Sequence, residues 1–238
     1  MEELRTRISI IRVMKLLTES ELIASPVVAN SRMNRERNAS GVNSYEKEFK
    51  FRPEDFLAEY IQAHGHVKWL DICCGEGKAL IQAASHLSAL QLHDKATLKG
   101  MDLIDGFDPV PAGISCVSFD IQSAVTWEPT EKYDLITCSH GLHYVGDKLK
   151  VLSRIFASLS ENGVFYGHLD LGNIMIMAVG DDYLKRAFKK NDIQYNGRTK
   201  LLYCKGPRTV TFGLNYVGAD DKSGPNYTGQ EAVTSYYT

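Results

Sequence analysis

A glycine-rich turn near residue 75 has the residue types and spacing of a ligand site. The run Asp71-Ile-Cys-Cys-Gly-Glu-Gly77 joins a short apolar segment to a helical one. Glycine permits a tight turn and has no Cβ to obstruct a ligand, and the N-terminus of the following helix presents unpaired N–H groups. The turn therefore predicts a place where ligand atoms approach the backbone.

Two further acids follow the next two predicted strands. A carboxylate at Asp102 can accept hydrogen bonds from both hydroxyls of a ribose. Asp120 could accept from an adenine amino group, while Ile121 covers the ring. Either acid alone could simply cap a turn. Three acids ending three successive strands reach one edge of a parallel sheet, and this conjunction favours a nucleotide site.

The elements that must position these acids alternate between strand and helix. A helix is predicted over 53–63, where Pro53 stands in the first turn. After it we expect strands at 67–72, 98–103, 114–119, 133–138 and 164–168, and helices at 79–90 and 149–159. Such alternation indicates an α/β fold with a parallel sheet covered by helices on both faces.

The chain end has a different pattern. Residues 209–217 alternate apolar and polar side chains, and the turn Lys205–Arg208 separates them from the apolar run 201–204. Period-two alternation predicts an antiparallel hairpin at the sheet edge. We expect three parts: a helical N-terminal extension or lid at 1–64, a nucleotide-binding domain at 65–217 and a tail at 218–238.

Several runs together resemble the class I S-adenosylmethionine-dependent methyltransferases. They are VKWLDICCGEG, GMDL, SFDI, YDLITCSHGLHYV and LSENGVFYGHLD, spread over roughly residues 65–170. The resemblance implies a Rossmann-like, seven-stranded, mostly parallel sheet with an antiparallel last strand, and S-adenosyl-L-methionine as cofactor. A dinucleotide dehydrogenase fits less well, because its GxGxxG fingerprint would need glycine where Leu80 stands.

The resemblance carries cofactor-binding roles onto matching positions. They are Asp71, Cys73, Gly75 and Gly77 in the turn, Asp102 and Leu103 at the ribose, Asp120 and Ile121 at the adenine, and Cys138 and Ser139 at the methionine end. The family usually has glycine where Cys73 stands. We expect an extended, β-region φ at Cys73, which would accommodate its side chain.

Two histidines directly after the fourth strand are candidate catalytic residues. Methyl transfer from a sulfonium depends mainly on alignment and exclusion of water, and it needs a general base only when the acceptor carries a proton. His140 and His143 titrate near neutral pH and could serve. The alternative for both, and especially for His143, is a packing or hydrogen-bonding role.

Composition excludes several classes of protein. The chain has 238 residues, 44% of them apolar, and a formal net charge of −2, which gives no electrostatic footprint for nucleic acid. No apolar run reaches the ~20 residues of a membrane helix. The five cysteines are odd in number and contain no CxxC pair, so we expect neither disulfides nor a metal site, and a cytoplasmic location.

The segments outside the predicted core should select the acceptor. We expect residues 25–50 to fold over the cofactor, with Arg37 or Tyr45 near its methionine carboxylate, although a solvated charged face is the alternative. An amphipathic helix at 4–17 leaves a homodimer open. The predicted acceptor is a small molecule or short peptide. The alternative function is a non-catalytic S-adenosylmethionine-binding or regulatory module.

Overall fold

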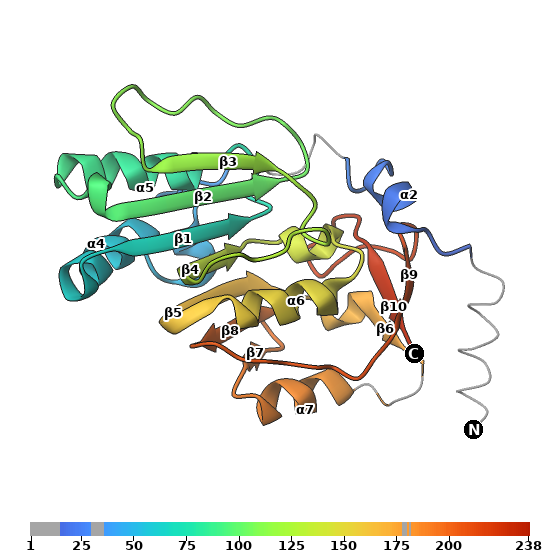
Figure 1. Cartoon of the computed structure of the whole chain (residues 1–238). Coiled ribbons are helices and arrows are strands. Elements are labelled where there is room, and N and C mark those ends of the chain that lie inside the picture. The colour runs from blue at the N-terminus through green and yellow to red at the C-terminus, as the bar shows by residue number, and fades with distance from the viewer. Residues whose placement is uncertain (1–14, 30–35, 178–179, 181) are drawn as a thin grey trace.

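A seven-stranded sheet forms the centre of the computed structural model, which describes residues 15–29, 36–177, 180 and 182–238 (Figure 1). The strand order is β3-β2-β1-β4-β5-β8-β7. The strands are β1 (Val67–Ile72), β2 (Ala96–Asp102), β3 (Val117–Ile121), β4 (Tyr133–Cys138), β5 (Leu159–His168), β7 (Gln194–Asn196) and β8 (Leu201–Lys205). All neighbouring pairs are parallel except those that β8 makes with β5 and β7. This confirms the predicted Rossmann-like α/β fold.

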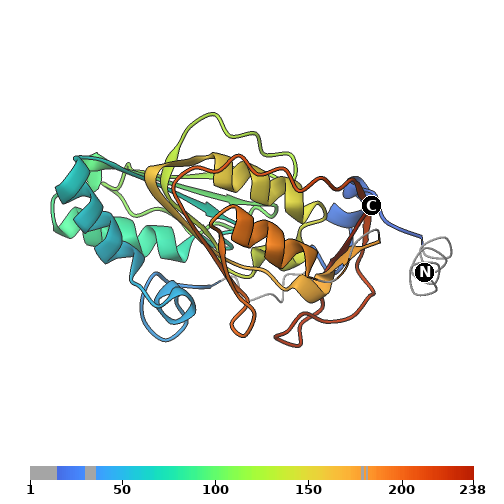
Figure 2. The ribbon, with the colours of Figure 1, turned by 90° about the horizontal axis from the view of Figure 1, so that it is seen from below.

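Helices cover both faces of this sheet, as Figure 2 shows for α5 and α6. Helices α4 and α5 pack with one another and with β1 and β2, while α6 packs on β5. The helices are α2 (Glu19–Ile23), α3 (Tyr45–Phe49), α4 (Pro53–His64), α5 (Lys78–Ala89), α6 (Lys148–Ala157) and α7 (Tyr183–Lys190). Short 3-10 turns are η1 (His93–Lys95), η2 (Gly141–Tyr144) and η3 (Leu171–Asn173). Two large buried apolar clusters form the core around the sheet, and a third, smaller one joins the N-terminal segment to β9.

The predicted hairpin at 201–217 is wrong. The antiparallel hairpin is made by β7 and β8, and residues 207–215 form no strand. A second sheet, ordered β6-β10-β9, contains β6 (Ile174–Ile176), β9 (Tyr216–Asp220) and β10 (Thr234–Tyr237). The alternating side chains of 209–217 reflect packing of Val210 and Phe212 in the core, because both are buried there without a partner strand.

The second sheet holds the segment around Leu17 and α2 in place. A β-bridge joins Leu17 to Ala219 of β9, directly before α2. Helix α2 starts with a capping box in which Thr18 and Glu21 exchange hydrogen bonds. The carboxyl ends of β1, β2 and β3 point toward this region in Figure 1. The amphipathic helix predicted at 4–17 falls almost wholly outside the described residues, as do residues 30–35 of the segment 25–50.

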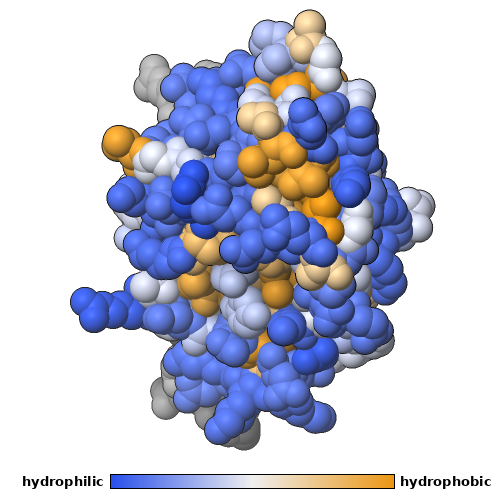
Figure 3. All heavy atoms as spheres, turned by 90° about the vertical axis from the view of Figure 1, so that its left-hand side faces the viewer, coloured by the Kyte–Doolittle hydropathy of each residue, from blue (hydrophilic) through white to orange (hydrophobic). Residues whose placement is uncertain are grey.

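The edge at which the parallel strands begin lies opposite the edge that faces α2. It faces the viewer in Figure 3 and is mostly hydrophilic, broken by apolar patches. Among the described residues, no helix has the length and apolar character needed to cross a membrane. The division into parts at residues 64 and 217 stays a prediction.

Candidate functional site

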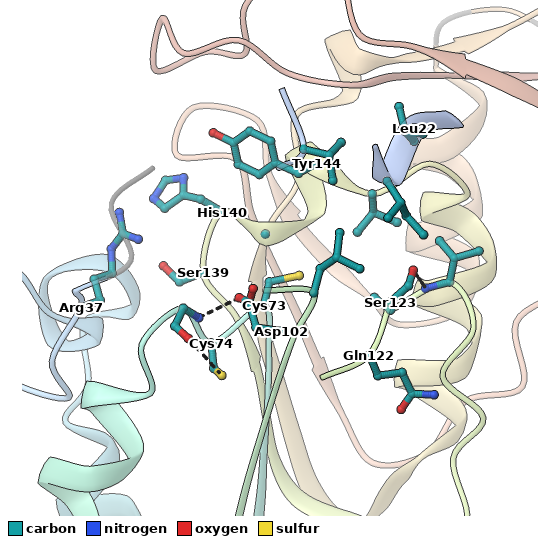
Figure 4. A pocket seen from close by; sticks show the side chains of 18 of the residues that line it. Leu22, Arg37, Cys73, Cys74, Asp102, Gln122, Ser123, Ser139, His140 and Tyr144 are labelled. Carbon is teal, nitrogen blue, oxygen red and sulfur yellow. Dashed lines mark hydrogen bonds between the residues drawn. The ribbon is translucent and has the colours of Figure 1, made fainter. Parts of the chain in front are cut away.

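A cavity of about 970 Å³, counted with its open mouth, lies at the carboxyl edge of the sheet (Figure 4). Open α/β sheets bind ligands at this edge. The strand ends contribute Cys73, Cys74, Gly75, Asp102, Leu103, Gln122, Ser123, Ala124, Val125, Ser139, His140 and Gly141. The rest of the lining comes from Glu19, Leu22, Ile23, Val28, Arg37, Tyr45, Tyr144, Val145 and Gln230. Segments far apart in the chain therefore surround one space.

The glycine-rich turn is held by its neighbour strand. The Cys74 amide donates to the Met101 carbonyl (3.1 Å) and the Gly75 amide donates to Asp102 Oδ2 (2.9 Å). Gly75 and Gly77 have φ values of +63° and +76°, in the left-handed region. A Cβ on Gly77 would lie 2.3 Å from Phe119 Cε1, so the turn passes too close to β3 for a side chain. Gly75 borders the cavity, whereas Gly77 lies behind it.

The expected extended conformation at Cys73 is wrong. Its φ is +58°, a left-handed conformation that costs a non-glycine residue about 1–2 kcal/mol. The opposite wall explains how the side chain fits, because a Cβ built on Gly141 would lie 2.3 Å from Cys73 Cβ. Position 73 thus holds a cysteine in a left-handed conformation, and its side chain has space because Gly141 has none.

Asp102 ends β2 at the centre of the cavity. Its Oδ2 accepts from Gly75, and its Oδ1 accepts from the Ile104 amide (3.1 Å). These two bonds fix the orientation of the carboxylate. Leu103 follows it in the lining, so this pair stands where the sequence predicts the ribose contact.

A buried hydrogen-bond chain connects the N-terminal extension to β1 and β4. Tyr45 on α3 donates to Asp71 Oδ2 (2.8 Å), and Thr137 donates to Asp71 Oδ1 (2.6 Å). Trp69 Nε1 in turn donates to the Thr137 hydroxyl (2.8 Å). Burial raises the pKa of Asp71 to about 7 although both hydrogen bonds lower it. Asp71 is fully buried and lies behind the lining, where it positions Tyr45.

Glu48, a partly buried residue of α3, contacts three basic side chains beside the cavity. Its Oε1 lies 3.2 Å from Arg37 Nε, and its Oε2 lies 3.1 Å from His140 Nε2 and 3.7 Å from His168 Nε2. Burial raises the pKa of Glu48, but its contacts with His140 and with the positively charged Arg37 lower it to about 2. Its carboxylate is therefore ionised at neutral pH.

This cluster also has the composition of a metal site. One ligand atom each from Glu48, His140 and His168 lies within 4.8 Å of the others. Two features oppose a cation there. The imidazoles of His140 and His168 stack at 4.2 Å and 7°, so their lone pairs run parallel instead of converging, and Arg37 already neutralises the carboxylate. The prediction of no metal site is neither confirmed nor contradicted by this geometry.

The two candidate bases occupy different environments. His140 borders the cavity, with a φ of +60° at the turn into η2. His143 is fully buried and outside the lining, and burial lowers its pKa to about 2. Its ring contacts Tyr227 edge-on at 5.6 Å. A base that must meet an acceptor needs access to the cavity, which His140 has and His143 lacks.

Of the predicted site residues that follow β4 and β3, some border the cavity and others do not. Ser139 borders the cavity, and its buried hydroxyl oxygen has no hydrogen-bond partner within the described ranges, while Cys138 is buried behind it. Asp120 and Ile121 lie outside the lining. Asp120 pairs with Lys99 at 2.7 Å, and Ile121 is exposed. The next residues, Gln122–Val125, border the cavity instead, because β3 continues through Ile121 before the chain reaches it.

Comparison with known proteins decides the family. A family model described as a methyltransferase domain matches residues 33–195, more than half of the chain. The chain belongs to this methyltransferase family. The match confirms the family predicted from the turn and strand-end motifs. No curated protein matches this chain.

Solved structures, two of them of methyltransferases, are similar to parts of the chain. The plantazolicin methyltransferase BpumL, in complex with a monoazolic desmethylPZN analog and SAH, has 17% sequence identity and a TM-score of 0.39, covering 62% of this chain and 51% of its own. CalS10, a SAM-bound amino pentose methyltransferase from Micromonospora echinaspora, has 18% identity and a TM-score of 0.34, covering 48% of each chain. YjhP from E. coli has 17% identity and a TM-score of 0.39, covering 62% and 55%. Each match spans about half of the matched chain.

Some site residues carry no signal in the sequence. Glu48 reads as one of several acids on a short amphipathic helix, and Gln122–Val125 read as a polar turn. The side chains of Glu19, Leu22 and Ile23 come from a five-residue helix placed by the C-terminal sheet. Spacing along the chain cannot reveal a neighbour brought in through such distant pairing. Arg37 and Tyr45, in contrast, border the cavity as the sequence predicts.

Proposed function

We propose that this chain transfers a methyl group from S-adenosylmethionine to a nucleophile of a small molecule or short peptide, by in-line displacement. One observation carries the proposal: in a chain of a methyltransferase family, the turn at Cys73–Gly75, the carboxylate of Asp102 and the Ser139–Gly141 segment border one cavity. These three groups come from the carboxyl ends of adjacent strands, where a nucleotide ligand is expected.

The chemistry of the lining fits the cofactor part by part. Asp102 would accept from the ribose hydroxyls, and the backbone at Gly75 leaves room beside them. Arg37 and Tyr45 would meet the methionine end, where the unpartnered Ser139 hydroxyl also lies. Gln122–Val125 would border the adenine. When bound, S-adenosylmethionine supplies an electrophilic methyl group on a good sulfonium leaving group.

The remaining lining supports a small acceptor. Leu22, Ile23 and Val28 bring apolar side chains from the N-terminal extension, and Tyr144 and Gln230 border the same space. Apolar walls exclude water, which would otherwise solvate the nucleophile and separate it from the methyl carbon. Enclosure by an extension of the chain, together with a formal net charge of −2, favours a small molecule or short peptide over a nucleic acid.

Binding of the demethylated product tests the cofactor assignment. Titration calorimetry with S-adenosylhomocysteine should give binding that Asp102→Asn weakens by roughly 10-fold or more, because hydrogen bonds to a charged acceptor contribute about 1.5–3 kcal/mol. The exposed Asp105 on the same loop offers the matched control, Asp105→Asn, which should bind as the unchanged chain does. Equal affinity for the two variants would contradict the proposed site.

Transfer itself is tested with a labelled methyl group. Incubation of the chain with S-adenosylmethionine carrying a ¹³C-methyl group and a fractionated metabolite extract should yield a labelled product. Binding of S-adenosylhomocysteine without labelled product in any fraction would favour the regulatory-module alternative over catalysis.

A further inference from the structure

The contact between Glu48 and His140 fixes the protonation pattern of the imidazole. The carboxylate of Glu48 is ionised, so it can only accept a hydrogen bond. At 3.1 Å from it, His140 Nε2 must therefore carry the hydrogen. In a neutral ring this leaves the lone pair on Nδ1, and no hydrogen bond to Nδ1 is found in the described part of the chain.

The surrounding groups are arranged to keep this ring in place. His168 of β5 stacks on one side of it at 4.2 Å, and Tyr227 lies at 6.1 Å. Phe49, next to Glu48, stacks on His168 at 5.4 Å. The imidazole is thus held by a carboxylate at one nitrogen and by rings at its faces, and His140 belongs to the lining of the cavity.

We propose that Glu48 is a positioning residue that presents His140 Nδ1 as general base to an acceptor hydroxyl, which makes the reaction an O-methylation. The inference rests on the proposed function and names its substrate class. A base is needed because an alcohol or phenol holds its proton near neutral pH, whereas a thiolate or a neutral amine needs none for the attack itself.

Charge balance favours a neutral hydroxyl over an ammonium group. The charged and titratable groups facing His140 are Glu48, Arg37, His143, His168 and Tyr227. Burial lowers the pKa of His143 to about 2 and of His168 to about 3, and it raises the pKa of Tyr227 to about 12. These three groups are therefore neutral near pH 7. Arg37 offsets Glu48, so no net negative charge remains to attract a cation.

The step balances with no further reactant. The acceptor oxygen forms a bond to the methyl carbon, and the carbon–sulfur bond breaks with its electron pair remaining on sulfur. The hydroxyl proton moves to His140 Nδ1, and the resulting imidazolium is stabilised by Glu48 until it releases the proton to water. General-base assistance of this kind contributes about 10²–10⁴-fold to a rate.

The first test needs neither acceptor nor cofactor. Long-range ¹H–¹⁵N spectra of the full chain, labelled at histidine and assigned with His140→Asn, should show His140 with its hydrogen on Nε2. Glu48→Gln should mix the two tautomers, because an amide can donate as well as accept. Glu46→Gln, two residues away on α3, is the matched control and should leave the spectrum unchanged. Hydrogen on Nδ1 in the unchanged chain would overturn the proposal.

The second test reads the class of product. In the extract experiment with ¹³C-methyl cofactor, the carbon shift separates O-methyl from N-methyl and S-methyl products. We expect an O-methyl product, formed about 100-fold or more slowly by His140→Asn and about 10-fold or more slowly by Glu48→Gln, with KM nearly unchanged. Glu46→Gln should be fully active.

The outcomes separate this inference from the function on which it rests. An N-methyl or S-methyl product, or full activity of His140→Asn, overturns the hydroxyl assignment and leaves a methyltransferase. Failure of the unchanged chain to bind S-adenosylhomocysteine would instead contradict the proposed function. Melting curves of each variant identify any that fail to fold, and Glu48→Asp, which keeps the charge, should recover part of the lost rate.

Discussion

The hydroxyl of Tyr45 donates a 2.8 Å hydrogen bond to the carboxylate of Asp71, and this buried contact joins the N-terminal extension to the first strand of the sheet. Tyr45 borders the cavity and Asp71 lies behind it. The acid that begins the glycine-rich motif thus acts through a tyrosine from another segment. Its protonation has a consequence for stability.

Asp71→Asn should flatten part of the pH dependence of unfolding. Burial raises the pKa of Asp71 to about 7 from 3.8, so the folded chain keeps a proton that the unfolded chain loses. The wild-type free energy of unfolding should therefore fall, relative to Asp71→Asn, as pH rises from about 4 to about 7, by up to about 4 kcal/mol. Urea unfolding across this range measures the difference. Identical pH profiles for the two proteins would contradict the raised pKa.

A glycine and a cysteine on facing turns should show strong coupling. A Cβ on Gly141 would lie 2.3 Å from Cys73 Cβ and 2.8 Å from its Sγ. Gly141→Ala should cost about 1–3 kcal/mol of stability by overpacking. Cys73→Gly removes both the obstruction and a left-handed non-glycine residue, so the double variant should recover most of that loss. Urea unfolding of the four proteins gives the coupling, and strictly additive effects would exclude the steric explanation.

The central sheet could be predicted from sequence because its information is local. The runs around Trp69 and Leu135 are short and apolar, and each is followed by a turn signal, so strand positions and the α/β class follow from the pattern. The edge near Val210 could not be predicted, since a buried irregular segment and a strand can share the same alternation. Pairing partners decide between them, and those are set by tertiary packing.

The site residues differ in the same respect: some positions are set by local sequence and others only by tertiary packing. Asp102 follows a strong strand directly, so its place at the sheet edge is fixed by the strand end. Asp120 failed to reach the cavity because β3 extends one residue beyond it and Lys99 of the neighbouring strand pairs with it. Glu48 could not be predicted, as its role depends on three partners that are separated from it in sequence.

Two variants test which residue contacts the adenine: Asp120, as the sequence suggests, or Gln122, which borders the cavity in the structure. Asp120→Asn should leave the affinity for S-adenosylhomocysteine within about 2-fold, because Asp120 pairs with Lys99 outside the lining and half-exposed pairs contribute little. Gln122→Ala should weaken binding by roughly 3–10-fold, as a lost neutral hydrogen bond does. Calorimetry on both variants decides the matter. A larger loss of affinity in Asp120→Asn than in Gln122→Ala would instead indicate that Asp120 contacts the adenine.

A buried lysine attaches the C-terminal sheet to the site. Lys148 Nζ donates to the carbonyls of Val145 and Val233, both at 2.8 Å, and to the Ser235 hydroxyl at 2.9 Å. Three acceptors match the three hydrogens of an ammonium group. Burial nevertheless lowers the pKa of Lys148 to about 7 from 10.5. Between these values the unfolded chain binds the proton more often than the folded chain does.

Lys148→Met should therefore remove a rise in stability with pH. Relative to the variant, the free energy of unfolding of the unchanged chain should increase from about pH 7 toward pH 10, by up to about 4 kcal/mol. The variant also loses three hydrogen bonds, so hydrogen exchange at Val233 and Ser235 should accelerate. Lys150→Met, an exposed change on the same helix, should alter neither the slope nor the exchange. A slope that persists in Lys148→Met would show that another group titrates there.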